Sequence, residues 1–223
     1  MAQKIHWKFA AMKTGLRLLE AVSPRWAGRV ALNISLTPQH HPASDAEQAI
    51  LNRAWRVVIY HGDDRLSGYV WDGDGATVLL VHGWEGGAHS LTPLVAPLQA
   101  QGFRVVAFDG PAHGISHARR TNLDDMGRAI RAAIEQFGPV YAIVAHSFGG
   151  AATMFAAAEG LPVERIVLLG APSKASELFA RFTTMFGLSE RVLQEMQGKA
   201  PWASTPTTVP TLPSCPLRSS TAL

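Results

Sequence analysis

The chain has 223 residues, 47% of them apolar and 17% charged, which suits one globular domain and excludes a chain that is disordered throughout. A single cysteine, Cys215, excludes an internal disulfide framework and a zinc site built from cysteines. The net charge of +3 comes from residues 1–30, where six basic residues face one acidic residue. The rest of the chain is nearly neutral and carries no DNA- or RNA-binding motif, so we expect no nucleic-acid partner.

Helical periodicity predicts an amphipathic helix near the N-terminus, within a helical segment that covers residues 1–53. Its apolar residues share one face and are Ile5, Phe9, Met12, Leu16 and Leu19. This face either docks on the domain or makes weak contact with an anionic membrane surface through residues 4–20. Lys8 and Lys13 interrupt the apolar run that a signal peptide needs, and the chain holds one cysteine, so we expect a cytoplasmic protein. Pro24 is expected to end the helix.

The next elements in chain order are a loop from residue 31, a short helix over 45–53 and two strands, over 56–61 and 66–71. Gly62, Asp63 and Asp64 form a turn signal between the two strands.

From residue 77 onward, strands and helices alternate. Continuous apolar runs predict buried strands over 77–81, 104–108, 140–145 and 165–169. Helices are expected between them, over 91–101, 123–137 and 148–158. Strands of this kind must be covered on both faces, so we predict an α/β fold with a doubly wound, mostly parallel sheet. Functional residues in such sheets lie where strands end and helices begin, and three unusual segments occur there.

The first segment is Ala145-His146-Ser147-Phe148-Gly149-Gly150. It matches the nucleophile-elbow pattern G-x-S-x-G, with alanine in place of the first glycine. A tight turn pushes Ser147 out at the strand end, and close approach requires small residues two positions away. The turn also directs the N–H of Phe148 and the helix N-terminus toward a reacting carbonyl oxygen. We interpret Ser147 as a nucleophile, and the alternative is a small-residue junction without chemistry.

The second segment, His82-Gly83-Trp84-Glu85-Gly86-Gly87, follows the strand over 77–81. A glycine-rich turn leaves backbone N–H groups free, and the N–H of Trp84 is a candidate second donor to an oxyanion. His82 lies inside the turn and precedes the serine in the chain. We therefore expect His82 to support the turn rather than to act as a catalytic base.

The third segment runs from Phe108 to Ser116 and contains Asp109-Gly110-Pro111-Ala112-His113-Gly114. Proline and glycine make the loop compact, and the side chain of Asp109 is expected to bond its backbone. A metal site using Asp109, His113 and His117 is an alternative, but the sequence supplies no convincing further ligand. We therefore expect no metal and no other cofactor, since the dinucleotide fingerprint G-x-G-x-x-G is also absent.

In this order and spacing, the three segments resemble the α/β-hydrolase fold superfamily, over about residues 56–172. The resemblance implies a serine nucleophile at Ser147 and an oxyanion hole formed by the N–H groups of Trp84 and Phe148. It implies hydrolysis of an ester, thioester or amide through an acyl-enzyme. The resemblance also includes the residues that shape the turns, which are His82, Gly83, Asp109, His146 and Gly149. Epoxide hydrolases and dehalogenases of this fold use an aspartate at the elbow, which disfavours their chemistry here.

The resemblance divides the chain into an α/β-hydrolase core over 54–172 and partial lid helices over 173–200. Apolar side chains of the lid would line an acyl pocket or pack in an ordinary core, and they are Leu178, Phe179, Phe182, Met185 and Phe186.

The triad of this family runs in the order Ser, then Asp or Glu, then His. The sequence has no histidine after His146 and no aspartate after Asp125. The later carboxylates are expected on helix surfaces or loops, and they are Glu159, Glu164, Glu177, Glu190 and Glu195. The general base that would activate Ser147 is therefore not encoded at its expected place.

Residues 201–223 contain five prolines and nine serines or threonines, with no strand or helix period. We expect an unstructured tail, produced by truncation or a shifted reading frame of a longer hydrolase, and the alternative is a genuine disordered tail. The sheet would then lack its last strands, and the strand over 165–169 would expose an apolar edge.

Two functions remain open at this point. The first is a serine hydrolase of carboxylic esters or related acyl compounds that works through Ser147 and is impaired by the missing acid and histidine. The second is a catalytically inactive, hydrolase-like binding or assembly module. An acyltransferase or perhydrolase on the same fold would share the serine. The expected partner of the first function is a small-molecule ester or acyl substrate.

Overall fold

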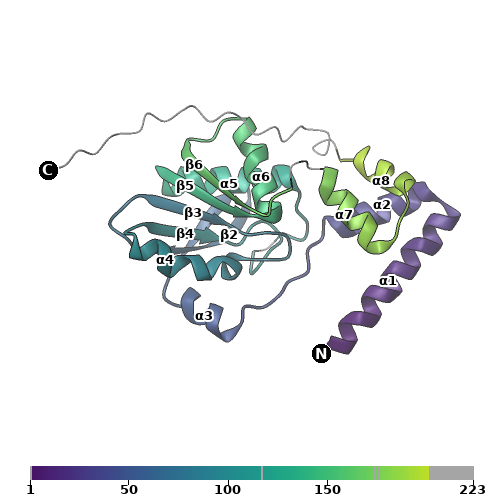
Figure 1. Cartoon of the computed structure of the whole chain (residues 1–223), viewed down its shortest axis with the longest axis horizontal. Helices are drawn as coiled ribbons and strands as arrows, with labels where there is room; N and C mark the ends of the chain where they lie inside the picture. Colours follow the sequence, from purple (N-terminus) through teal and green to yellow (C-terminus); the bar gives the residue numbers. More distant parts are fainter. Residues whose placement is uncertain (1, 117, 173, 175, 201–223) are drawn as a thin grey trace.

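The computed structural model describes residues 2–116, 118–172, 174 and 176–200, so the predicted tail over 201–223 lies outside the described residues. An α/β body and a separate group of helices lie side by side (Figure 1). The strands of the body are β1 (Trp55–His61), β2 (Asp64–Trp71), β3 (Thr77–Val81), β4 (Arg104–Phe108), β5 (Val140–His146) and β6 (Val163–Leu169). Its helices are α3 (Asp45–Leu51), the 3-10 helix η1 (Ala88–Leu94), α4 (Val95–Ala100), α5 (Leu123–Phe137) and α6 (Ser147–Ala158). The other four are α1 (Ala2–Val22), α2 (Pro24–Ser35), α7 (Ser176–Phe186) and α8 (Glu190–Gln197), and we name them the helical cap.

The six strands form one sheet in the order β1-β2-β4-β3-β5-β6. The four strands β4, β3, β5 and β6 are parallel, and Leu79 of β3 lies between Val106 of β4 and Ile143 of β5. The hairpin of β1 and β2 joins antiparallel to β4. The sheet is therefore mostly parallel, as the sequence predicts, with an antiparallel pair at one edge.

Helices cover both faces of the sheet (Figure 1). On one face, Met126 and Ile130 of α5 pack with Val106 and Phe108 of β4 in one buried cluster that also includes α6. On the other face, Leu51 of α3 packs in a second cluster with η1 and α4. Every residue of β3 is buried, because side chains on both of its faces are covered. The doubly wound α/β fold is confirmed.

Two elements differ from the sequence prediction. Residues 91–101 form a 3-10 helix followed by a short α-helix rather than one helix, with Pro93 inside the 3-10 part. Pro93 has no N–H to donate to the preceding turn, which disfavours a continuous α-helix. Pro24 begins a helix as well as following one: it is the first residue of α2, and Ser23 caps that helix by accepting a bond from the N–H of Trp26. The predicted loop from residue 31 is therefore wrong up to Ser35.

β6 forms one edge of the sheet in the part of the chain that the structure describes. Its apolar side chains are partly uncovered there, with exposed fractions of 47% for Val167, 38% for Leu168 and 37% for Leu169. Among the described residues, the apolar edge therefore lies where the sequence places it.

The helical cap has its own apolar core, separate from the two clusters of the sheet. Phe9, Met12, Leu16 and Leu19 of α1 pack there against α2, α7 and α8, which agrees with a docked helix. The side chain of Ile5, the remaining residue of the predicted apolar face, lies outside the described residues. Helices α1 and α2 therefore share one core with α7 and α8, although the sequence prediction assigns them to separate segments, whereas α3 packs on the sheet. No helix in the described part of the chain is both long and apolar enough to cross a membrane.

Candidate active site

Ser147 stands at the junction of β5 and α6 in a backbone conformation that side chains rarely adopt. Its φ is +47°, in the left-handed region, where a non-glycine residue carries strain. Gly149, two residues later, approaches the backbone of His82 so closely that a Cβ there would overlap the carbonyl oxygen of His82. A sharp turn between small residues therefore presents the hydroxyl of Ser147 at the end of the strand.

The turn after β3 lies directly against this elbow. β3 and β5 are parallel neighbours with Val81 paired to Ala145, so both strands end at the same edge. Gly83 faces the elbow: a Cβ there would lie 2.7 Å from Nδ1 of His146 and 3.3 Å from Cβ of Ser147. A side chain at position 83 would therefore displace the ring of His146 and press on Ser147.

The two candidate oxyanion donors belong to residues whose rings are in contact. The rings of Trp84 and Phe148 meet edge to face, with centroids 5.0 Å apart. Phe148 is the second residue of α6, and the first four N–H groups of a helix have no partner within it. The N–H of Phe148 is therefore available at the positive end of the helix dipole, next to Ser147.

His82 holds the turn together through both ring nitrogens. Its Nε2 accepts a hydrogen bond from the N–H of Gly110 at 2.9 Å, so Nδ1 carries the proton and donates to the carbonyl oxygen of Gly83 at 2.7 Å. The ring is buried, and burial lowers the pKa of His82 to about 4. With a neutral ring committed to two backbone groups, His82 is not placed to take a proton from Ser147.

Asp109 ties the loop after β4 to the turn after β3. Its carboxylate accepts hydrogen bonds from the N–H of Ala88 at 2.8 Å and from the N–H of Ile115 at 3.2 Å. Burial raises the pKa of Asp109 above its ordinary value, although these two bonds oppose the rise. A carboxylate that both loops share keeps the two strand-end segments in fixed register.

His113 lies beneath Trp84 and Phe148, a position that the sequence does not reveal. Its Nδ1 donates to the carbonyl oxygen of Pro111 at 2.9 Å, and its Nε2 has no partner among the described residues. Burial lowers the pKa of His113 to about 3, and the nearby ring of His82 adds to the shift. His113 therefore acts here as a neutral aromatic ring, with centroids 5.3 Å from Trp84 and 6.3 Å from Phe148. His117, the third residue of the metal alternative, lies outside the described residues.

A pocket of about 400 Å³ opens in front of Ser147, between the α/β body and the helical cap. This size falls within the range of small-molecule sites. All five lid side chains that the sequence singles out line it, which are Leu178, Phe179, Phe182, Met185 and Phe186. Phe179 and Phe186 are also buried in the core of the cap, so core packing is confirmed for these two residues, while the acyl pocket stays a prediction. The sequence prediction misses Phe9 and Met12 of α1, residues 34–37 and Arg181, which also line the pocket.

Among the described residues, Glu85 is the only carboxylate that lines this pocket with Ser147. Its oxygens are engaged elsewhere: one accepts a bond from the N–H of Gln39 at 3.2 Å and the other lies 3.6 Å from Nε2 of His41. Two of the later carboxylates are also paired, Glu159 with Arg131 and Glu195 with Lys199. No triad partner of Ser147 is found in the described part of the chain.

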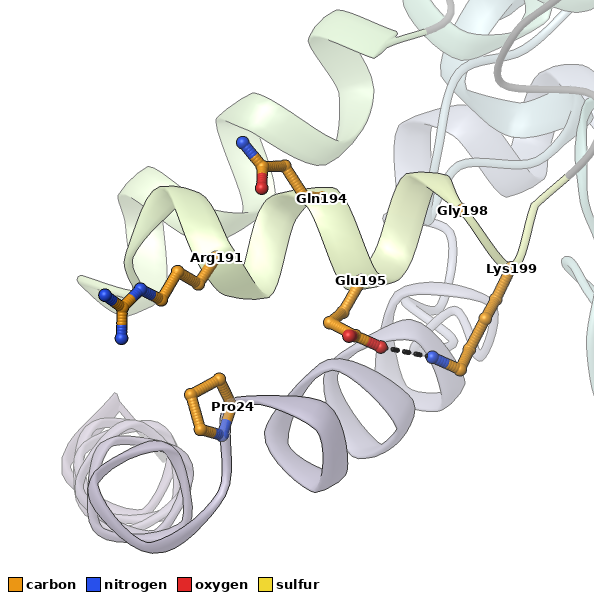
Figure 2. Close-up of a pocket in the computed structure, with 6 residues that line it drawn as sticks. All are labelled: Pro24, Arg191, Gln194, Glu195, Gly198 and Lys199. Carbon is orange, nitrogen blue, oxygen red and sulfur yellow. Dashed lines mark hydrogen bonds and ion pairs between the residues drawn. The ribbon is translucent and has the colours of Figure 1, made fainter.

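A second hollow, of about 440 Å³, lies on the outside of the helical cap (Figure 2). It lies between Pro24 at the start of α2 and the side chains of α8, where Glu195 and Lys199 form an ion pair. None of its lining residues belongs to the three strand-end segments. The pocket at Ser147, rather than this hollow, is the candidate active site.

Comparisons with known proteins find hydrolases among the proteins that this chain resembles. The chain is 33% identical over 128 residues to a serine hydrolase-like protein of Danio rerio, and the match covers 51% of this chain and 38% of that relative. The fold is similar to that of the Pyrococcus furiosus esterase Pf2001, at 21% identity and a TM-score of 0.62, over 77% of this chain and 71% of the esterase. A second crystal form of the same esterase gives a TM-score of 0.59 at 20% identity over the same shares of both chains.

The chain spans less than half of the length of the Danio rerio relative, and the likeness to the esterase shows the fold alone. The family comparison covers more of the sequence. Residues 78–219 match the alpha/beta hydrolase family, a stretch that contains all three strand-end segments. This chain belongs to the alpha/beta hydrolase family.

Proposed function

We propose that this chain acts on carboxylic esters or related acyl compounds as a serine hydrolase, with Ser147 as its nucleophile. The observation that carries the proposal is the strained backbone of Ser147, with a φ of +47°, at the floor of the pocket. Strain of this kind is retained where the surrounding structure enforces it, most often at functional sites. The names of the two relatives, a serine hydrolase-like protein and an esterase, also support the proposal.

The reaction follows from the geometry. Oγ of Ser147 attacks the acyl carbon, its proton passes to the departing alcohol, and a covalent acyl-enzyme remains. The N–H groups of Phe148 and Trp84 would stabilise the negative charge on the carbonyl oxygen, where loss of one such donor costs about 100- to 1000-fold in rate. Water then attacks the same carbon and releases the acid.

No general base for this reaction is identified among the described residues. No histidine follows His146 in the chain, and His82 and His113 are neutral, buried and bonded to backbone groups. Serine hydrolases that lack a triad member keep roughly 1000- to 10,000-fold of catalysis over water, through binding and the oxyanion hole. We therefore propose a slow hydrolase, and the same observation favours a hydrolase-like binding module as the second candidate.

Labelling with a fluorophosphonate probe separates the two candidates. We expect slow labelling of the folded chain, confined to Ser147 and abolished in Ser147→Ala. Ser35 is a matched control, because it lines the same pocket while its hydroxyl donates to the carbonyl oxygen of Leu32 at 2.8 Å. Ser35→Ala should label like the unchanged chain. A folded chain that stays unlabelled would refute the hydrolase and leave the binding module.

A further inference from the structure

The pocket at Ser147 has two walls of different chemistry. The wall formed by the α/β body is mixed: polar Ser147, Glu85, Thr121 and Asn122 lie beside the rings of Trp84 and Phe148. The wall formed by the helical cap is mainly aliphatic and aromatic. A ligand that matches both walls carries its polar group at Ser147 and an apolar part against the cap.

Both ends of the described chain build the apolar wall. Phe9 and Met12 come from α1, and Phe182 and Phe186 come from α7. The ring centroids of Phe9 and Phe186 lie 5.0 Å apart, and those of Phe182 and Phe186 lie 4.5 Å apart. These three rings belong to the apolar core of the helical cap, so α1 forms part of the pocket wall.

The few charged side chains that line the pocket are compatible with an apolar ligand. Glu85 is held by Gln39 and His41 at the body wall. Arg181 of α7 is the single cation among the described lining residues, and its side chain is exposed. The described cap wall is otherwise uncharged.

We infer that the pocket takes a straight aliphatic acyl chain, with its carbonyl group at Ser147 and its tail against the wall that α1 and α7 form together, and that Phe9 and Met12 set the accepted chain length. The inference rests on the proposed function for the reactive end of the ligand. Flexible, unbranched Met12 beside the rings of Phe9 and Phe186 suits a tail without fixed shape. Each methylene that enters such a site strengthens binding by about fourfold, until the tail reaches the end of the pocket.

The test uses straight-chain fatty acids as probes, because their binding needs no catalysis. The full-length chain with Ser147→Ala is titrated calorimetrically with saturated acids from butanoate to tetradecanoate. We expect the affinity to rise by about fourfold for each methylene and then to level off at one chain length. Met12→Trp narrows the pocket and should move this levelling-off to a shorter acid, whereas Met12→Ala should move it to a longer one.

Leu18→Trp is the matched control, since Leu18 lies on the same helix but is 65% exposed and does not line the pocket. It should leave the levelling-off point unchanged. The inference is overturned if affinity does not depend on chain length, or if neither Met12 variant moves the levelling-off point. If Met12→Trp fails to fold, as judged by circular dichroism, Met12→Ala alone decides.

The outcome is distinguishable from that of the proposed function. Fluorophosphonate labelling of Ser147 without chain-length-dependent binding would overturn the acyl pocket and keep the hydrolase. Chain-length-dependent binding without labelling would keep the acyl pocket and favour the binding module.

Discussion

Nε2 of His82 accepts a hydrogen bond from the N–H of Gly110 at 2.9 Å, which joins the turn after β3 to the loop after β4. The bond requires a ring that is unprotonated at Nε2. The carboxylate of Asp109 makes a second link between the same segments, through the N–H of Ala88. The edge of the sheet that presents Ser147 is therefore braced by two buried polar side chains, and each can be tested.

The stability of the fold should fall as pH decreases below about 6.5. Burial lowers the pKa of His82 to about 4 and that of His113 to about 3, whereas both rings take up protons near pH 6.5 in the unfolded chain. Their contribution is complete above pH 6.5 and is lost as pH falls toward the folded-state pKa values. Between pH 7.5 and 5.5 the pair should cost roughly 2–3 kcal/mol of unfolding free energy.

Urea denaturation at several pH values measures this decline. In His82→Gln or His113→Gln, about half of the decline between pH 7.5 and 5.5 should disappear. A decline of unchanged size in both variants would show that other groups cause it.

Gly149→Ala should destabilise the fold strongly. The new Cβ would overlap the carbonyl oxygen of His82 and lie 2.8 Å from Cγ1 of Val81, so backbone must move. We expect a loss of about 1–3 kcal/mol or more, measured by urea denaturation. Gly15→Ala is the control, because no atom lies within 4 Å of its Cβ position and alanine favours the helix. Equal stability of the two variants would argue against the close approach at the elbow.

Gly83→Ala should impair the site more than the fold. Its Cβ would lie 2.7 Å from Nδ1 of His146, an exposed side chain that is free to move, but also 3.3 Å from Cβ of Ser147. We expect fluorophosphonate labelling to slow by on the order of 10- to 100-fold, because displacement of a reacting group is costly. The melting temperature should change little. Labelling at the original rate would mean that the turn does not position the elbow.

Asp109→Asn should loosen both strand-end loops. An amide has one oxygen, so it places N–H groups against Ala88 or Ile115 and leaves one backbone donor unsatisfied. The expected cost is about 1–3 kcal/mol of unfolding free energy. Asp124→Asn is the control, since Asp124 is a helix-surface residue paired with Arg128 and should cost less than about 1 kcal/mol. Similar costs for the two changes would contradict the bracing role of Asp109.

Ser147→Gly should be more stable than Ser147→Ala. Both changes remove the hydroxyl, but only glycine adopts a φ of +47° without strain. We expect a difference of about 1–2 kcal/mol in unfolding free energy in favour of glycine. At an ordinary helical backbone alanine would be the more stable of the two, so the order of the two variants reports the strain directly.

Much of the α/β body can be predicted from the sequence, because its signals are local. The apolar run over 77–81 indicates a strand covered on both faces, and every residue of β3 is buried. The helix predicted over 123–137 is α5, and Asn122 caps its start by accepting a bond from the N–H of Asp125. The three strand-end segments follow from their glycines and from their places after strands.

The wall of the pocket is harder to predict, because it depends on contacts between distant parts of the chain. Periodicity shows that α1 has an apolar face, but it does not show that this face meets α7 about 170 residues later. Pro24 follows one helix and begins the next, so the proline alone does not show that a second helix starts there. The buried position of His113 beneath Trp84 also comes only from packing between two loops.

The helical cap constrains the order in which parts of the fold can form during synthesis. α1 and α2 leave the ribosome before the α/β body, but α7 and α8, which complete their shared apolar core, are translated some 150 residues later than α1. The bond from the N–H of Ser189 to Glu20 spans 169 positions of the chain. During synthesis the α/β body therefore has time to form while α1 and α2 still lack α7 and α8. The pocket at Ser147 is completed last, when α7 packs against α1 beside it.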